Sequence, residues 1–173
     1  EQAPELIQYA VDTGFLAGRY DIDTDVWNPR EIPSHLTHIR TEGYPEDVVV
    51  TENGSMQKNW TRYLNGRPVD GYTICSSAFW KYAQPRIGND LIQNNYNARF
   101  FDTILSIALL ECYSKNHPQT RYEDMVSKKT YLQAVRDKFG LIMGSEDIRD
   151  YAVNQVDYTE GVLTIVAAPD AAY

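Results

Sequence analysis

The chain has 173 residues, of which 43% are apolar and 23% are charged, and its formal net charge is −8. This length and composition suit one folded domain spanning residues 1–173, with a real hydrophobic core rather than general disorder. The acidic balance excludes a general binder of nucleic-acid phosphates, so nucleic acid is not an expected partner. The longest apolar run, at residues 104–110, is far shorter than the roughly 20 residues that span a bilayer.

The N-terminal residues predict a short helix. Pro4 suits a first helical position and Gly14 suits a helix end, with an apolar side between them. The first residue is Glu rather than Met, so we expect a sequence that was processed, trimmed or excerpted from a longer one.

Residues 15–47 are predicted to form an extended, acidic, proline-containing loop or arm within the domain. Pro29, Pro33 and Pro45 each push the preceding residue away from helical backbone. Residues 1–60 carry eleven acids against four bases, so the acidic excess is N-terminal. Long loops of this kind commonly form binding surfaces.

Residues 48–75 resemble a three-stranded β-meander in their pattern. Asn53-Gly54 and Asn65-Gly66 are strong hairpin-turn signals, and the residues between them alternate between two faces. A helix over residues 55–64 is the competing interpretation.

Residues 90–113 predict one long central helix. An apolar row recurs every four residues and a second row lies beside it, so most of this helix would be buried. The two rows are Ile92, Tyr96, Phe100, Ile104, Ala108 and Cys112, and Phe101, Leu105 and Leu109.

The C-terminal part predicts three shorter helices, over residues 121–127, 129–139 and 146–153, followed by a terminal hairpin over 156–166. The expected fold class is therefore α+β. In it, the Asn-Gly meander and the terminal hairpin pack on a helical layer around the central helix.

Two short clusters are candidate metal ligands. Asp21, Asp23 and Asp25 alternate as the first oxygen ligands of a calcium loop do, although the glycine and closing acid of such a loop are missing. His35 and His38 are three residues apart and could share a metal if that segment coils. No cofactor is expected.

Cysteine and histidine elsewhere give weaker signals. Cys75 and Cys112 would pair only if their backbones approach closely, and buried thiols are the commoner outcome. Cys75-Ser76-Ser77 follows a predicted strand but lacks the glycines that flank a nucleophile elbow. No catalytic residue is assigned.

Aromatic residues are numerous, with three tryptophans and thirteen tyrosines. Partly exposed Trp and Tyr are typical of protein interfaces and of sugar-binding surfaces. Four candidate binding residues follow from this: Trp27, Trp60, Tyr63 and Trp80.

These observations favour a soluble, non-enzymatic protein-protein interaction or assembly subunit over an enzyme. We expect a structural component of a viral particle or of another assembly, located there or in the cytoplasm, with protein partners that include a second copy of itself. One alternative is an acidic inhibitor or immunity-type protein that blocks a basic site. Another is a small hydrolase that uses carboxylates or the His35 and His38 pair, since the separation of carboxylates is invisible in sequence.

Overall fold

The computed structural model describes residues 3–160. The elements in chain order are α1 (Pro4–Asp12), β1 (Gly18–Ile22), β2 (Asp25–Trp27), β3 (Lys58–Leu64), β4 (Arg67–Thr73), the 3-10 helix η1 (Ser76–Ala78), α2 (Phe79–Gln93), β5 (Ala98–Asp102), α3 (Arg121–Phe139), β6 (Ile142–Glu146), the 3-10 helix η2 (Asp150–Ala152) and β7 (Tyr158–Glu160). The predicted mixture of helices and strands is confirmed.

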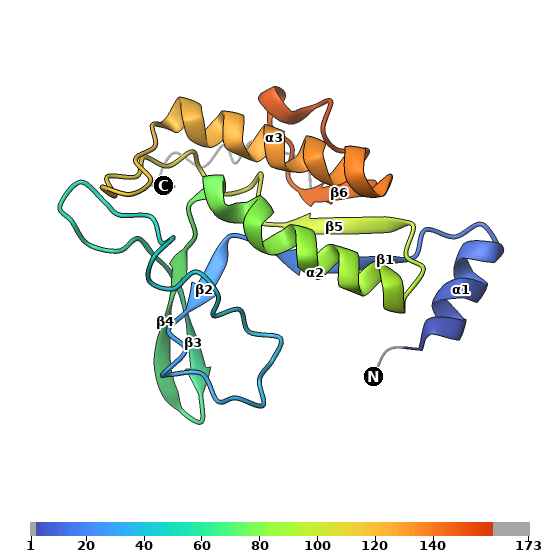
Figure 1. Cartoon of the computed structure of the whole chain (residues 1–173), viewed down its shortest axis with the longest axis horizontal. Helices are drawn as coiled ribbons and strands as arrows, with labels where there is room; N and C mark the ends of the chain where they lie inside the picture. The colour runs from blue at the N-terminus through green and yellow to red at the C-terminus, as the bar shows by residue number, and fades with distance from the viewer. Residues whose placement is uncertain (1–2, 161–173) are drawn as a thin grey trace, which may run out of the picture.

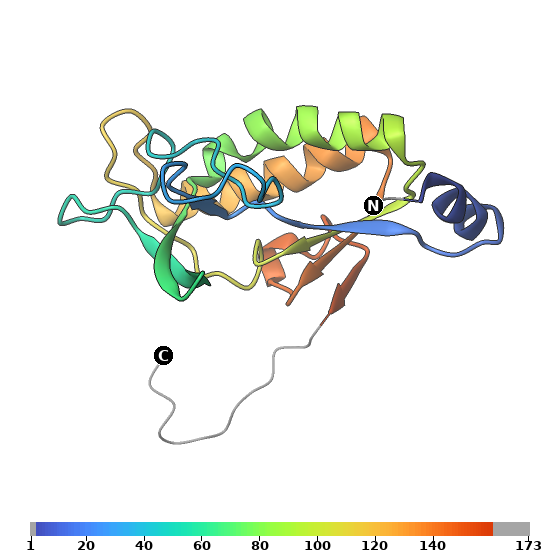
Figure 2. The ribbon, with the colours of Figure 1, turned by 90° about the horizontal axis from the view of Figure 1, so that it is seen from below.

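The main sheet has four strands in the order β1-β5-β6-β7, and every neighbouring pair is parallel. Helices α2 and α3 run along one face of this sheet (Figures 1 and 2). The opposite face carries no α-helix among residues 3–160 (Figure 2). Strand, helix and parallel strand therefore alternate, as in α/β proteins that place their sites at the carboxyl ends of the strands.

A smaller antiparallel sheet, in the order β2-β4-β3, extends from one end of the main sheet (Figure 1). Strands β3 and β4 form a hairpin, in which Asn65 and Gly66 both have positive φ, as its tight turn requires. The third strand is β2, whereas Val48 and Val50 make only isolated bridges. The predicted meander over residues 48–75 is thus not three consecutive strands.

The predicted central helix over residues 90–113 is wrong. Helix α2 ends at Gln93, because Asn94 is extended, and residues 98–102 form β5 in the middle of the main sheet. Asn97 occupies the bend between them, and its Oδ1 accepts a hydrogen bond from the Ala17 amide at 2.8 Å. The apolar residues of β5, Ala98, Phe100 and Phe101, form a short run that periodicity alone cannot distinguish from a segment of a buried helix.

Other boundaries differ from expectation as well. Residues 15–47 contain β1 and β2, so the irregular loop covers only residues 28–47. The two helices expected over 121–139 are one helix, α3, with a capping box of Thr120 and Glu123 at its start. Residues 146–153 hold the end of β6 and η2 rather than a helix. The first arm of the expected terminal hairpin contains β7, which is parallel to β6, and its second arm lies outside the described residues.

The core lies between the main sheet and the two long helices. It is built from Phe79, Ala83 and Ile87 of α2, Tyr131, Leu132 and Val135 of α3, Phe101 of β5 and Met143 of β6, with further residues from the connecting loops. Within residues 3–160, no helix is both long and apolar enough to cross a membrane.

Candidate functional site

The face of the main sheet opposite α2 and α3 carries an aromatic layer. Because side chains alternate along a strand, every second residue points away from the helices. The register places Tyr20, Phe100, Gly144 and Tyr158 in one row across the four strands. The rings of Tyr20 and Phe100 stack with centroids 5.7 Å apart, and those of Phe100 and Tyr158 are 6.3 Å apart. Gly144 leaves room for the Tyr158 ring, which a Cβ would meet at 2.3 Å.

Acidic residues occupy the next row on this face, two residues further along each strand. Ile22 pairs with Asp102, and Glu146 pairs with Glu160. Phe100 of β5 pairs with Gly144 of β6. Asp102 and Glu146 each lie two residues further along their strands, so these two acids are also neighbours. Asp102, Glu146 and Glu160, hereafter the carboxylate row, therefore end three adjacent parallel strands on the same face. Carboxyl ends of strands are where α/β folds place catalytic groups.

Two hydroxyl groups contact the carboxylate row. The Tyr20 hydroxyl donates a hydrogen bond to Oδ2 of Asp102. The Ser106 hydroxyl, from the loop after β5, donates to Oε2 of Glu146 at 2.8 Å. Partial burial, the hydrogen bond to Asp102 and the nearby charges of Asp102, Glu146 and Asp25 all raise the pKa of Tyr20. Tyr20 is therefore a neutral hydrogen-bond donor at physiological pH.

An ion-pair network behind β1 and β5 holds these strands in place. Arg99, which is fully buried, contacts Asp21 through Nε, and its NH1 lies 3.0 Å from Oδ2 of Asp90. Arg86 of α2 bridges Asp21 and Asp23. Burial alone would lower the pKa of Arg86, but the charges of Asp23 and Asp21 outweigh burial and raise it. The network fixes the register of β1 against β5, and therefore of Tyr20 against Asp102.

A cavity of about 620 Å³ adjoins β1, and Tyr20 and Ile22 line part of it together with Arg86 of α2. Asp25 also lines the cavity and accepts hydrogen bonds from Trp60 Nε1 at 2.6 Å, from Thr24 at 2.8 Å and from Asn59. Burial raises the pKa of Asp25, and these hydrogen bonds oppose that rise. The volume lies within the range of about 300–1,000 Å³ usual for small-molecule sites.

The four aromatic residues predicted to bind a partner have different surroundings. Trp27 is buried, and the Arg62 guanidinium lies over the rings of both Trp27 and Trp60. Trp60 and Tyr63 are exposed on β3, whereas Trp80 of α2 packs on Phe139. Of these four, the structure brings only Trp27 to the cavity lining. Their role in binding stays a prediction.

The predicted metal ligands are also placed apart. Asp21 and Asp23 face arginines, with Asp23 also accepting a hydrogen bond from Tyr131 at 2.5 Å, while Asp25 turns toward Trp60. His35 and His38 are exposed in the loop over residues 28–47, and His38 lines the cavity. Among residues 3–160, the side chains close enough together to share a metal ion are not these predicted ligands but a different group.

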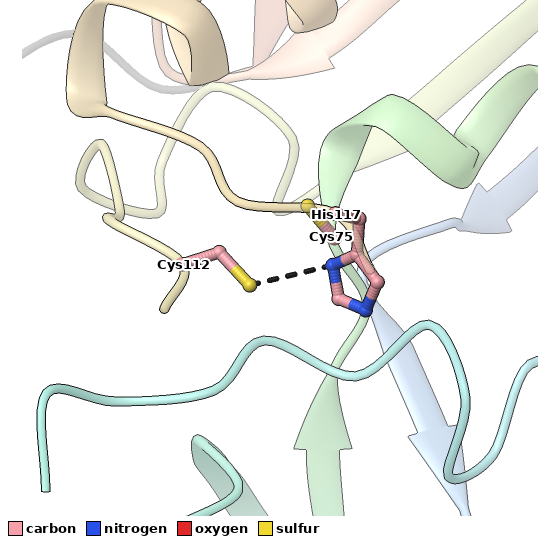
Figure 3. A group of neighbouring side chains, drawn as sticks. All are labelled: Cys75, Cys112 and His117. Carbon is pink, nitrogen blue, oxygen red and sulfur yellow. Dashed lines mark hydrogen bonds between the residues drawn. The ribbon is translucent and has the colours of Figure 1, made fainter. Parts of the chain in front are cut away.

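That group consists of Cys75, Cys112 and His117 (Figure 3). One ligand atom from each residue lies within 4.8 Å of the other two. Both cysteines are free and buried. Burial and the neighbouring Cys112 raise the pKa of the Cys75 thiol to about 11, although hydrogen bonds from Ser77 lower it in part. No pattern of spacing linked these three residues in the sequence, because Cys75 follows β4 whereas Cys112 and His117 lie in the loop between β5 and α3.

The carboxylate row was missed for a related reason. Asp102, Glu146 and Glu160 each follow a short apolar or β-prone run, which is the signal of an acid at a strand end. Asp102 was assigned to the interior of the false central helix, and Glu146 to the start of another helix. The signal becomes visible only when 98–102 and 142–146 are recognised as strands.

Comparison with known proteins identifies the family. The family model of "Glycosyl hydrolases related to GH101 family, GH129" matches residues 1–172. No curated protein matches the chain.

Solved structures share the fold. The ligand-free α-N-acetylgalactosaminidase NagBb from Bifidobacterium bifidum is 17% identical with a TM-score of 0.74, over 98% of this chain and 26% of that one. The GalNAc complex of NagBb is 16% identical with a TM-score of 0.72, over 90% of this chain and 23% of that one. The α-galactosidase TtGalA from Thermus thermophilus, in complex with stachyose, is 13% identical with a TM-score of 0.57, over 90% of this chain and 30% of that one. The chain thus spans about a quarter of the length of the NagBb structures.

These findings overturn the functional expectation. A non-enzymatic assembly subunit, a virion component or another structural protein is wrong, because a family of glycosyl hydrolases matches nearly the whole chain. The preference against an enzyme is wrong for the same reason. The chain belongs to the glycosyl hydrolases related to the GH101 family, GH129.

Proposed function

We propose that this chain carries the catalytic carboxylates of a retaining glycosidase, with Asp102 as the nucleophile and Glu146 as the acid and base. The observation that carries the proposal is the carboxylate row, in which Asp102 and Glu146 end two neighbouring parallel strands on one face. Glycoside hydrolysis generally uses two carboxyl groups that flank the scissile bond.

The strand spacing supports retention of configuration. Neighbouring strands lie about 4.8 Å apart, so carboxyl groups on adjacent strands in the same row fall near the separation of about 5–5.5 Å found in retaining enzymes. Inverting enzymes need about 6.5–9.5 Å, to leave room for a water molecule. Asp102 would attack the anomeric carbon while Glu146 protonates the leaving oxygen. Glu146 would then remove a proton from the water that hydrolyses the glycosyl-enzyme.

Hydrogen bonding supports the assignment of the two roles. Asp102 accepts from Tyr20, which has a raised pKa and stays protonated, so this donor holds the Asp102 carboxyl group in position. Glu146 is held by Ser106 from the following loop and has the longer side chain, which reaches toward a leaving group. The cavity beside Tyr20, with Asp25 and Trp27 in its lining, is the surface to which we assign sugar binding.

For the substrate we propose a terminal α-linked N-acetylgalactosamine. The support is the name of the NagBb structures, which are α-N-acetylgalactosaminidases sharing this fold, one of them in complex with GalNAc. Since the chain spans about a quarter of those structures, the assay requires the full-length protein.

The test uses an aryl α-N-acetylgalactosaminide and the full-length enzyme. Asp102→Asn is expected to abolish turnover. Glu146→Ala is expected to lose most activity, and added azide should restore it by forming a glycosyl azide of retained configuration, because a small anion attacks the glycosyl-enzyme without needing a base. Glu111→Gln, outside the carboxylate row, is the control.

An azide product of inverted configuration from Glu146→Ala would contradict its assignment as acid and base. Full activity in Asp102→Asn would refute the whole proposal. If both carboxylates prove essential but α-N-acetylgalactosaminides are not cleaved by the wild type, only the substrate assignment fails.

A further inference from the structure

Cys75, Cys112 and His117 lie outside the candidate active site and have no part in the proposed mechanism. Cys75 follows β4 by two residues, whereas Cys112 and His117 both belong to the loop between β5 and α3. Backbone hydrogen bonds in both directions between Cys112 and Gln119, at 2.7 and 2.9 Å, close the intervening loop and hold His117 over Cys112. Figure 3 shows the imidazole and the two sulfur atoms converging.

The histidine is oriented as a ligand. Its Nε2 lies 2.9 Å from the backbone carbonyl of Glu46, which can only accept, so Nε2 carries the proton. Nδ1 therefore presents its lone pair to Cys112 Sγ, 3.4 Å away. Metal-binding histidines are oriented in this way, with the other ring nitrogen donating to a carbonyl or carboxylate.

Each sulfur atom accepts a hydrogen bond from a neighbouring group. The amide of Val50 donates to Cys112 Sγ at 3.4 Å, and the Ser77 hydroxyl donates to Cys75 Sγ at 3.3 Å. Donors to sulfur stabilise negative charge there. A buried thiolate pair without a cation would be costly, whereas a divalent metal ion compensates both charges.

An oxygen atom is available as a fourth ligand. Oε1 of Gln119 accepts a hydrogen bond from the Cys75 thiol at 2.9 Å, so it already lies beside one of the two sulfur atoms. The amide nitrogen of Gln119 donates to Ser76 at 2.7 Å and to Asp124 at 3.1 Å, which leaves the oxygen directed at Cys75 Sγ. A pocket lined by Cys112, Tyr113 and Gln119 gives access from solvent.

We propose that Cys75, Cys112 and His117 form a zinc site, with Gln119 Oε1 or a water molecule as the fourth ligand. Two thiolates and one imidazole are the soft and borderline ligands that tetrahedral zinc prefers. Binding replaces one proton on each thiol, so one Zn²⁺ displaces two protons from the neutral site. The ion would tie the end of β4 to the β5–α3 loop, which also carries Ser106, the hydrogen-bond partner of Glu146.

The test uses the full-length protein, stripped of metal by a chelator in the presence of a reductant, with Co²⁺ as the spectroscopic probe. The expected result is a thiolate-to-cobalt charge-transfer absorption that is displaced by Zn²⁺, and a melting temperature raised by Zn²⁺. Cys112→Ser and His117→Ala should each weaken binding by at least about tenfold, since even the loss of an outer-shell partner has that effect. His35→Ala, exposed in the loop over 28–47, should bind as the wild type does.

His117 is only half buried, so His117→Ala is expected to fold, and circular dichroism can confirm this. Loss of metal binding in this variant then cannot be attributed to unfolding. The proposal is wrong if reduced wild-type protein shows no thiolate-to-cobalt absorption, or if Cys112→Ser retains it unchanged. It is also wrong if the protein isolated without reductant has a Cys75–Cys112 peptide pair lacking two hydrogen atoms, because that mass identifies a disulfide instead.

Discussion

Tyr20 connects the carboxylate row to the cavity beside β1. Its ring stacks on Phe100 and its hydroxyl donates to Asp102. The raised pKa of Tyr20 means that the donor keeps its proton, and thus its hydrogen bond, throughout the neutral pH range. This single contact therefore holds the proposed nucleophile in position.

Tyr20→Phe tests that contact, because it removes the hydroxyl and keeps the ring. A hydrogen bond to a charged group contributes about 1.5–3 kcal/mol, so kcat/KM should fall about 10- to 100-fold. The measurement is steady-state hydrolysis of the aryl glycoside. Tyr63→Phe, exposed on β3, should leave kcat/KM unchanged. Unchanged kinetics in Tyr20→Phe would show that Asp102 does not depend on this donor.

At the scale of elements, α3 is held at both ends by side chains. Thr120 and Glu123 form a capping box at its start, and Gly140 ends it with a positive φ of 64°. Near its last turn, Arg136 pairs with Asp157 at 3.1 Å in the segment before β7. These contacts place α3 on β5 and β6, the strands that carry Asp102 and Glu146.

Thr120→Ala should destabilise the protein by about 1 kcal/mol, since the cap hydrogen bond to the Glu123 amide is lost. Chemical denaturation measures the change in the free energy of unfolding. Thr120→Ser, which keeps the hydroxyl, is the matched control and should recover most of the loss. Equal destabilisation by both changes would argue against the capping role.

The contact of Asp157 with Arg136 is expected to be sensitive to acid. Partial burial alone would raise its pKa, but the Met143 amide and Arg136 together lower the pKa of Asp157 below its usual value. A lowered folded-state pKa stabilises the fold above the unfolded value of about 3.9, and this stabilisation is lost as pH falls through the folded pKa. It is modest, because the Asp157 side chain is 36% exposed.

Asp157→Asn should therefore lower the melting temperature at pH 7 and leave it nearly unaffected at the lowest pH at which the protein folds. The comparison is thermal unfolding of variant and wild type as a function of pH. Asp137→Asn, exposed on α3 and hydrogen-bonded only to Gln133 among the described contacts, should show no such difference. A pH-independent effect of Asp157→Asn would contradict the proposed linkage.

At the scale of the whole molecule, buried charges join elements that are distant in sequence. Arg99 of β5 contacts Asp21 of β1 and Asp90 of α2, while Tyr131 of α3 donates to Asp23. Burial and the nearby Asp23 raise the pKa of Tyr131, which keeps this donor protonated. One network thus holds the register on which the candidate site depends.

Arg99→Ala should destabilise the protein by about 3–5 kcal/mol, because it leaves Asp21 and Asp90 buried with fewer partners. Arg67→Ala, exposed near the β3–β4 turn, is the control and should have little effect. Equilibrium denaturation by urea measures both. A small effect of Arg99→Ala would show that the remaining arginines are enough to compensate the two carboxylates.

Helix ends and tight turns could be predicted from the sequence, because they depend on the backbone preferences of neighbouring residues. Pro4 and Gly14 bracket α1, Asn65-Gly66 turns the β3–β4 hairpin, and Gly140 ends α3. Each depends on backbone preferences of one or two residues, which the sequence displays directly. The expectation of protein partners was not tested and stays a prediction.

The position of the candidate site depends on packing between distant parts of the chain. Strand β5 has an aromatic side chain on each face, Phe101 in the core and Phe100 against the rings of Tyr20 and Tyr158, and in sequence this pattern cannot be distinguished from a helix. Asp102 and Glu146 are separated by 43 intervening residues, yet the parallel register of β5 and β6 makes them neighbours. Short-range turns and caps follow from local residue patterns, whereas strand order and register, which result from packing, bring the carboxylates together.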